Sequence, residues 1–77
     1  MLDRVVAFLS DYMKNPTKEI HENTQLIADL GFNSLQMMQI VNDAELVFDI
    51  EIDDDELRDL VTVGDIVRLL EKKAAGN

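Results

Sequence analysis

The residue that most invites a chemical role is Ser34, which lies in the stretch DLGFNSLQMM at residues 29–38. A serine nucleophile needs a base that accepts its proton and a further group that orients this base. The chain contains one histidine, His21, and residues 31–34 do not match the G-x-S-x-G pattern of serine hydrolases. We therefore predict that the protein is not an enzyme and that it has no catalytic residue.

The acidic residues offer a second chemistry, the binding of a metal ion. Residues 49–53 (DIEID) have carboxylates at the first, third and fifth positions, as an EF-hand loop does. That loop also needs glycine at its sixth position and glutamate at its twelfth, where this chain has Asp54 and Leu60. No group of His, Asp or Glu has zinc spacing, and no glycine-rich phosphate loop is present. The sequence predicts no bound metal.

Ser34 can instead be a substrate for modification. Asn33 and Ser34 are both good N-cap residues, so a helix is expected to begin at one of them. A hydroxyl group there lies beside unsatisfied backbone N–H groups and the positive end of the helix dipole, which favour a phosphodiester. The simpler interpretation is that Ser34 only caps the helix. The residue types alone leave both interpretations open.

Hydrophobic periodicity predicts four helices, at residues 2–14, 33 or 34 to 48, 53–60 and 62–73. Pro16 is expected to end the first helix, and the capping-box spacing of Thr62 and Asp65 to begin the last. Residues 15–33 show no period and predict a long loop. The expected fold is all-α, a small four-helix bundle of three longer helices and one short helix. It forms a single domain, 1–77, in which residues 74–77 fray.

The same periodicity assigns the core. The predicted core stripe of the second helix consists of Met37, Ile40, Val41, Ala44, Val47 and Phe48, and the predicted apolar anchors of the loop are Ile20, Leu26, Ile27 and Leu30. Leu35, Met38 and Leu46 project away from that stripe. Scattered exposed apolar residues are ordinary, but Leu35 and Met38 lie close to Ser34 and predict a contact surface there.

The charge of the chain limits its partners. Residues 1–38 carry five acidic and three basic residues (−2), residues 39–77 carry eleven and four (−7), and the whole chain has a net charge of −9. Nucleic acid and anionic membranes would repel it, whereas a basic partner would be attracted. With no cysteine and no apolar run of membrane-spanning length, we expect a cytoplasmic protein without membrane insertion. Self-repulsion favours a monomer.

Residues 23–35 (NTQLIADLGFNSL) resemble the segment of the acyl carrier protein family that leads into its D-S-L attachment motif. The resemblance continues through residues 48–52 (FDIEI), the acidic turn at 53–56 and residues 60–63 (LVTV), so it covers nearly the whole chain. It implies that a phosphopantetheinyl transferase attaches 4'-phosphopantetheine from coenzyme A to Ser34, with Asn33 and Leu35 beside the attachment site. The arm would hold acyl, polyketide or aminoacyl intermediates as thioesters and deliver them to ligase or synthase enzymes.

In this family the second helix is the main docking element. The resemblance therefore implies apolar or polar partner contacts at Leu35, Met38 and Asn42, and charge contacts at Asp43 and Glu45. We also hypothesise that such a small bundle shelters an apolar chain between its helices.

Two features depart from the family pattern. The usual aspartate before the serine is Asn33, and positions that are commonly acidic are Gln36 and Gln39. These changes predict a cognate transferase, weaker and more apolar docking, and a carrier that serves a specialised pathway. Because the sequence starts at Met1 and contains little beyond the domain, we expect a freestanding carrier. The alternative is an unmodified acidic interaction module on the same fold.

Overall fold

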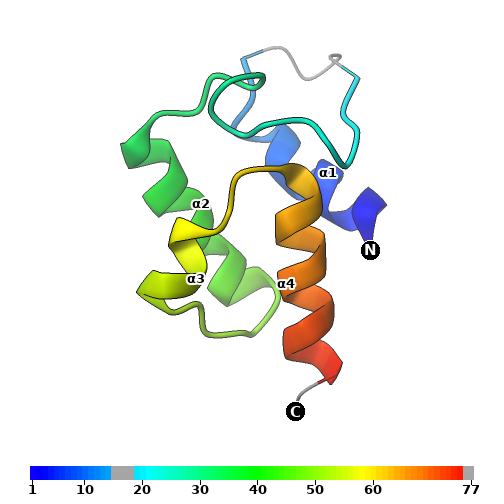
Figure 1. Cartoon of the computed structure of the whole chain (residues 1–77), viewed down its shortest axis with the longest axis vertical. Helices are drawn as coiled ribbons and strands as arrows, with labels where there is room; N and C mark the ends of the chain where they lie inside the picture. The colour runs from blue at the N-terminus through cyan, green and yellow to red at the C-terminus, as the bar shows by residue number, and fades with distance from the viewer. Residues whose placement is uncertain (15–18, 76–77) are drawn as a thin grey trace.

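The computed structural model describes residues 1–14 and 19–75, which contain four α-helices. These are α1 (Leu2–Ser10), α2 (Ser34–Val47), the short α3 (Asp54–Arg58) and α4 (Val63–Ala75). In Figure 1, α2 and α4 both descend from the end where the long connection lies, while α1 runs toward that end. The described residues include no strand, only one isolated bridge between Gln25 and Thr62. The predicted all-α bundle with a long loop between the first two helices is confirmed.

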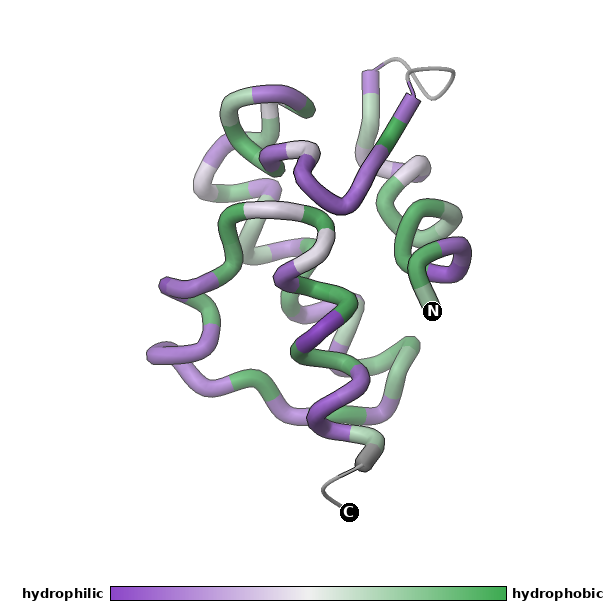
Figure 2. The backbone as a smooth tube through the Cα atoms, turned by 45° about the vertical axis from the view of Figure 1, so that its right-hand side comes forward, coloured by the Kyte–Doolittle hydropathy of each residue, from purple (hydrophilic) through white to green (hydrophobic). Residues whose placement is uncertain are grey.

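The core forms where the amphipathic helices α1 and α4 pack against each other. Val5 and Leu9 of α1 are fully buried, and α4 contributes Val63, Ile66, Val67 and Leu70. Hydrophobic and hydrophilic residues alternate along the tube of α4 in Figure 2, as expected for a helix with one buried face. From α2, the core receives Met37 and Ile40. Val47, predicted as core, is 58% exposed, because the buried face of α2 continues from Ala44 to Phe48, four residues on, and leaves Val47 beside it.

Helix α1 ends earlier than the apolar pattern predicted. The Ser10 hydroxyl donates to the carbonyl of Ala7 at 2.7 Å, and the N–H groups of Tyr12 and Met13 bond three residues back, to Leu9 and Ser10. Side-chain bonds of this kind compete with the α-helical ladder, and three-residue bonds tighten the chain into 3₁₀-type turns. The half-buried side chains of Tyr12 and Met13 still pack on the core. The predicted stop at Asn15-Pro16 falls outside the described residues.

The long connection is fixed by backbone bonds to the start of α4. The N–H of Leu26 donates to Val61 O at 2.9 Å, and the N–H of Gly64 donates to Glu22 O at 2.8 Å. A Cβ atom at position 64 would lie 3.0 Å from that oxygen, so a larger residue there would displace the backbone at Glu22 by a few tenths of an ångström. Leu26 and Phe32 are buried, but Ile27 is 60% exposed, and its prediction as an anchor was wrong. The path of the backbone beside residues 61–64 turns Ile27 outward.

The remaining helix boundaries agree with the sequence within two residues. Helix α3 begins one residue after the predicted Asp53 and ends at Arg58, and none of its residues is fully buried. Residues 49–52 form no strand, and Ile50 and Ile52 are half-buried rather than fully buried. Helix α4 continues through Ala75, so residues 74 and 75 are helical where fraying was expected. Among the described helices, none combines the length and hydrophobicity needed to cross a membrane.

Candidate functional site

The first turn of α2 is closed by a neutral capping box. The Asn33 side chain accepts a hydrogen bond from the N–H of Gln36 at 2.8 Å, and the Gln36 side chain accepts one from the N–H of Asn33 at 3.1 Å. Asn33 has the extended conformation of an N-cap (φ −96°, ψ 177°), and Ser34 is the first helical residue. The predicted start of the second helix is confirmed, and the cap is Asn33 rather than Ser34.

This arrangement leaves the side chain of Ser34 without a structural task. It is exposed, and within the described residues its hydroxyl group makes no hydrogen bond. The first turn of α2 contains no acidic residue, so no carboxylate neutralises the positive end of the helix dipole there. The competing interpretation, that Ser34 serves as the helix cap, does not hold. An anion bonded to this oxygen would lie at an uncompensated helix N-terminus.

Ser34 lies at the edge of a mostly apolar groove of about 380 Å³. A volume of this size is in the usual range for a small-molecule site. Its lining comes from α2 (Ser34, Met37, Met38), from the long connection (Gln25, Ile27, Ala28) and from α3 and the residues after it (Leu57, Arg58, Leu60, Val61). An extended apolar substituent on the Ser34 oxygen therefore has an apolar surface next to its point of attachment.

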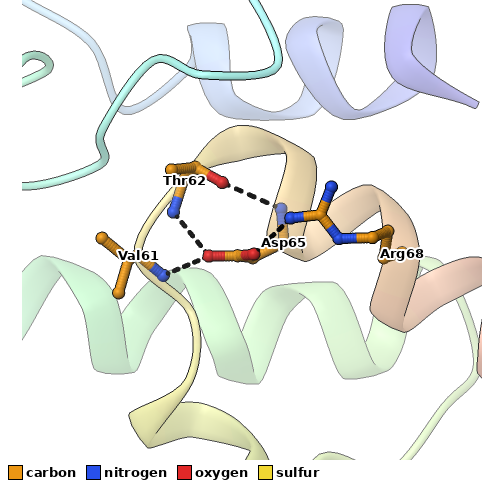
Figure 3. A network of polar contacts seen from close by, with 4 residues as sticks. All are labelled: Val61, Thr62, Asp65 and Arg68. Carbon is orange, nitrogen blue, oxygen red and sulfur yellow. Dashed lines mark hydrogen bonds and ion pairs between the residues drawn. The ribbon is translucent and has the colours of Figure 1, made fainter.

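One wall of the groove is held by the capping box of α4, drawn in Figure 3. The Asp65 carboxylate accepts hydrogen bonds from the N–H groups of Val61 and Thr62, both at 2.9 Å, and pairs with Arg68. The N–H of Asp65 donates to the Thr62 hydroxyl at 3.1 Å, which confirms the predicted box. The bond from Thr62 is the main cause that lowers the pKa of Asp65 to about 2; partial burial opposes it, and Val61 and Arg68 reinforce it.

Helix α3, in the same lining segment, is attached to α4 through an ion pair. Lys73 Nζ of α4 lies 2.8 Å from Glu56 Oε1 of α3, and both side chains are mostly buried. The N–H of Asp53, which donates to Glu56 at 3.0 Å, is the largest cause that lowers the pKa of Glu56, followed by Lys73. The bond to Glu56 raises the pKa of Lys73. This pair fixes α3 beside α4 although α3 buries no residue fully.

The predicted partner contacts on α2 fall into two groups. Leu35, Met38 and Asn42 are exposed and follow one another at spacings of three and four residues, so they share a face of the helix. Leu35 is 65% exposed and Met38 59%. Leu46, 82% exposed, extends the same face by one turn. The structure thus brings Leu35 and Met38 together with Ser34 at one end of an open apolar stripe.

Asp43 and Glu45, predicted as charge contacts, have partners inside the molecule. Both are half-buried. The Tyr12 hydroxyl donates to Asp43 Oδ2, and the N–H of Ile52 donates to Glu45 Oε2 at 2.9 Å. Burial, followed by the bond to Asp43, raises the pKa of Tyr12 to about 12. These two carboxylates therefore join α2 to the end of α1 and to the segment before α3.

The groove contains residues that the sequence did not single out. Ile27 was assigned to the core, and Leu57, Arg58 and Val61 were given no role. For Leu57 and Val61 the only signal was a group of apolar residues at positions 57, 60 and 61, at the end of the short acidic helix and just after it. They become neighbours of Ser34 through folding, because three separate segments form the groove. Within the described residues, no group of three or more His, Asp or Glu side chains is arranged to hold a metal ion.

Comparisons with known proteins show the family of the chain. The family model described as "Phosphopantetheine attachment site" matches residues 3–70. The chain is 36% identical to an acyl carrier protein of Thermotoga maritima over 73 residues, covering 95% of this chain and 90% of that protein. It is 32% identical to one of Sulfurovum sp. over 71 residues (92% and 95%), and 42% identical to one of Wolinella succinogenes over 57 residues (74% of each).

The fold and the site define a small helical carrier that bears a prosthetic group. The chain belongs to the acyl carrier protein family. It is a phosphopantetheine-bearing carrier, and it is not an enzyme. Its partners include a phosphopantetheinyl transferase and enzymes that handle acyl groups.

Proposed function

We propose that 4'-phosphopantetheine is attached to the hydroxyl oxygen of Ser34. One observation carries this proposal. Asn33 caps α2, so the first helical residue keeps an exposed hydroxyl group that has no partner among residues 1–14 and 19–75, beside an apolar groove. The neutral first turn of α2 suits the negative charge of a phosphodiester, since both its free N–H groups and its dipole favour an anion.

The attachment reaction needs groups from the transferase. The serine oxygen forms a bond to the phosphorus that carries pantetheine in coenzyme A, the P–O bond of the diphosphate breaks, and adenosine 3',5'-bisphosphate leaves. The serine proton passes to a base of the transferase, because within the described residues no hydrogen bond joins the Ser34 hydroxyl to a side chain that could accept it. Ser34 supplies the acceptor oxygen, and α2 holds it in an accessible position.

The bound group supplies a thiol on a flexible arm, which carries acyl, polyketide or aminoacyl cargo as a thioester. Tethering raises the effective concentration of the cargo at each partner's active site. The apolar groove beside Ser34 gives an attached chain a place out of water between deliveries. We place this work in the cytoplasm, with the protein acting as a monomer.

Partner enzymes dock on the exposed stripe of α2, through Leu35, Met38 and Asn42. Their docking surfaces are apolar at the centre and basic around it, which matches a carrier of charge −9. Asp43 and Glu45 contribute to the negative electrostatic field of the carrier, although each accepts a hydrogen bond within the molecule, from Tyr12 and Ile52 respectively. Replacing Leu35 by glutamate should lower kcat/KM of the transferase at least about tenfold with little change in Tm. Leu46→Glu, at the far end of α2, is the matched control and should have a smaller effect.

The attachment site is tested by intact-protein mass after incubation with coenzyme A, Mg²⁺ and a broad-specificity or cognate transferase. The chain has two serines, and the Ser10 hydroxyl is used at the end of α1. Wild type and Ser10→Ala should gain one phosphopantetheinyl group, and Ser34→Ala should gain none. A gain in Ser34→Ala would refute the assignment. No gain in wild type with any transferase, the cognate one included, would favour the unmodified interaction module.

A further inference from the structure

The groove beside Ser34 has one feature that an apolar chain does not require. Of the residues that line it, one is charged, and that residue is Arg58. The chain as a whole has sixteen acidic and seven basic residues, so a positive group at this site is opposite to the overall charge. A groove meant only for a hydrocarbon gains nothing from a guanidinium group at its edge.

Arg58 is available to a new partner. It comes from α3, and its guanidinium lies 3.1 Å from the carboxylate of Asp55, one turn earlier in the same helix. Both side chains are highly exposed, 77% for Arg58 and 91% for Asp55. Exposed pairs of this kind are weak, and a competing anion can replace Asp55 with little loss. The methylene stem of arginine covers apolar surface while its head stays at the rim.

The phosphodiester on Ser34 is not the anion that we assign to Arg58. It would be bonded directly to Ser34, where the N–H groups of the first turn of α2 already face it. Arg58 lies on α3, which forms a different wall of the groove. The same groove is lined by the apolar side chains Met37, Met38, Leu57 and Leu60, which can cover the chain of a cargo molecule. An anionic group at the far end of such a chain would meet the guanidinium.

We propose that Arg58 gives this carrier a preference for cargo with a free carboxylate at the end of an apolar chain. The inference rests on the proposed attachment at Ser34. Arg58 binds the terminal carboxylate at the rim, the apolar walls cover the methylene groups, and the thioester is thereby kept in the groove. Arginine suits this role because its planar fork can bind a carboxylate through two parallel N–H···O bonds.

The test compares two cargoes of equal length. Ser34 is loaded by the transferase from hexanoyl- or adipoyl-coenzyme A, and loading is verified by mass, so a failure of the attachment site is seen before the cargo is compared. The measurement is the rate at which hydroxylamine cleaves each thioester. In wild type the adipoyl thioester should be cleaved about threefold more slowly than in Arg58→Gln, as an exposed charge pair implies. The hexanoyl thioester should be cleaved at the same rate in both proteins.

Three further variants separate charge pairing from other effects. Lys72→Gln removes one positive charge from the last turn of α4, outside this groove, and should behave as wild type. Arg58→Lys should keep part of the protection. Asp55→Asn removes the carboxylate that pairs with Arg58 and should increase the protection of the adipoyl thioester. In ¹³C NMR spectra, the pKa of the terminal adipoyl carboxyl should be lower in wild type than in Arg58→Gln.

Two outcomes would overturn the proposal. Equal protection of the adipoyl thioester in wild type and Arg58→Gln would show that the guanidinium does not bind the cargo. An Arg58→Gln effect of the same size on the hexanoyl thioester would show that Arg58 acts on the phosphodiester or on the shape of the groove.

Discussion

The helices α2 and α4 both begin with a capping box, but the two boxes differ in charge. At α4 the box contains the Asp65 carboxylate, which accepts hydrogen bonds from two backbone N–H groups and pairs with Arg68 (Figure 3). At α2 the box is made of two amides, Asn33 and Gln36, and the first turn has no acid. The positive end of the α4 dipole is thus neutralised by a carboxylate within the fold. The cap of α2 makes the corresponding hydrogen bonds but carries no negative charge. The difference separates a terminus that stabilises the molecule from one that can receive an anion.

The largest expected effect concerns the charged box. Asp65→Ala removes the acceptor for the N–H groups of Val61 and Thr62, and hydrogen bonds to charged groups contribute about 1.5–3 kcal/mol. We expect unfolding in urea to show a loss of about 2–3 kcal/mol. The matched control is Glu71→Ala, which removes an exposed carboxylate from the same helix and should change stability by less than about 0.5 kcal/mol. Equal losses in the two variants would contradict the role of the box.

Acid should remove a smaller part of the same stabilisation. The pKa of Asp65 is about 2 in the folded protein against 3.8 ordinarily. The unfolded state therefore binds more protons between these values, and stability falls as the pH decreases from about 4 to 2. Above pH 4, wild type should exceed Asp65→Asn by about 1–2 kcal/mol, allowing for partial exposure. Urea unfolding at a series of pH values should show the two proteins converging near pH 2; a constant difference would refute the assignment.

A charge added to the neutral box should make α2 resemble α4. Gln36→Glu keeps the capping geometry and places a carboxylate in the first turn, which should stabilise the unmodified protein by about 0.5 kcal/mol. The same carboxylate repels a phosphodiester on Ser34, so modification should raise the Tm of this variant less than that of wild type, or should lower it. Thermal unfolding before and after modification measures both effects. Gln39→Glu, beyond the first turn, is the control and should alter neither quantity as much.

The smallest expected change in stability is that of Asn33→Asp. Asparagine and aspartate are nearly equal as N-caps, so the stability should change by no more than a few tenths of a kcal/mol. The rate of modification should nevertheless increase with a broad-specificity transferase, because the variant restores the aspartate usual in the family. Mass spectrometry over time gives this rate. An unchanged rate would mean that the transferase does not use the carboxylate.

These two termini also show how far the sequence can predict the structure. The start of α2 at Ser34 and the box of Thr62 and Asp65 were predictable, because capping depends on residues three positions apart. The end of α1 was not, because Tyr12 and Met13 keep helical spacing while the backbone changes to three-residue bonds. The exposure of Ile27 depends on bonds to residues 61–64, far along the chain.

The candidate site divides in the same way. Ser34 and the exposed side chains of Leu35 and Met38 followed from the local pattern of one helix. The groove did not, because it joins three segments, and Arg58 gains significance only through this proximity. The internal bonds of Asp43 and Glu45 were equally invisible, since their partners, Tyr12 and Ile52, lie on other segments.

The contact between Gly64 and Glu22 has a consequence for how this sequence can change over evolutionary time. A single methyl group at position 64 would push against the carbonyl oxygen of Glu22 and force the polypeptide around it to shift. That polypeptide leads within a few residues to Gln25 and Ile27, which form part of the surface next to Ser34. A substitution of this glycine would therefore also act on the lining of the groove beside Ser34, although position 64 lies in α4.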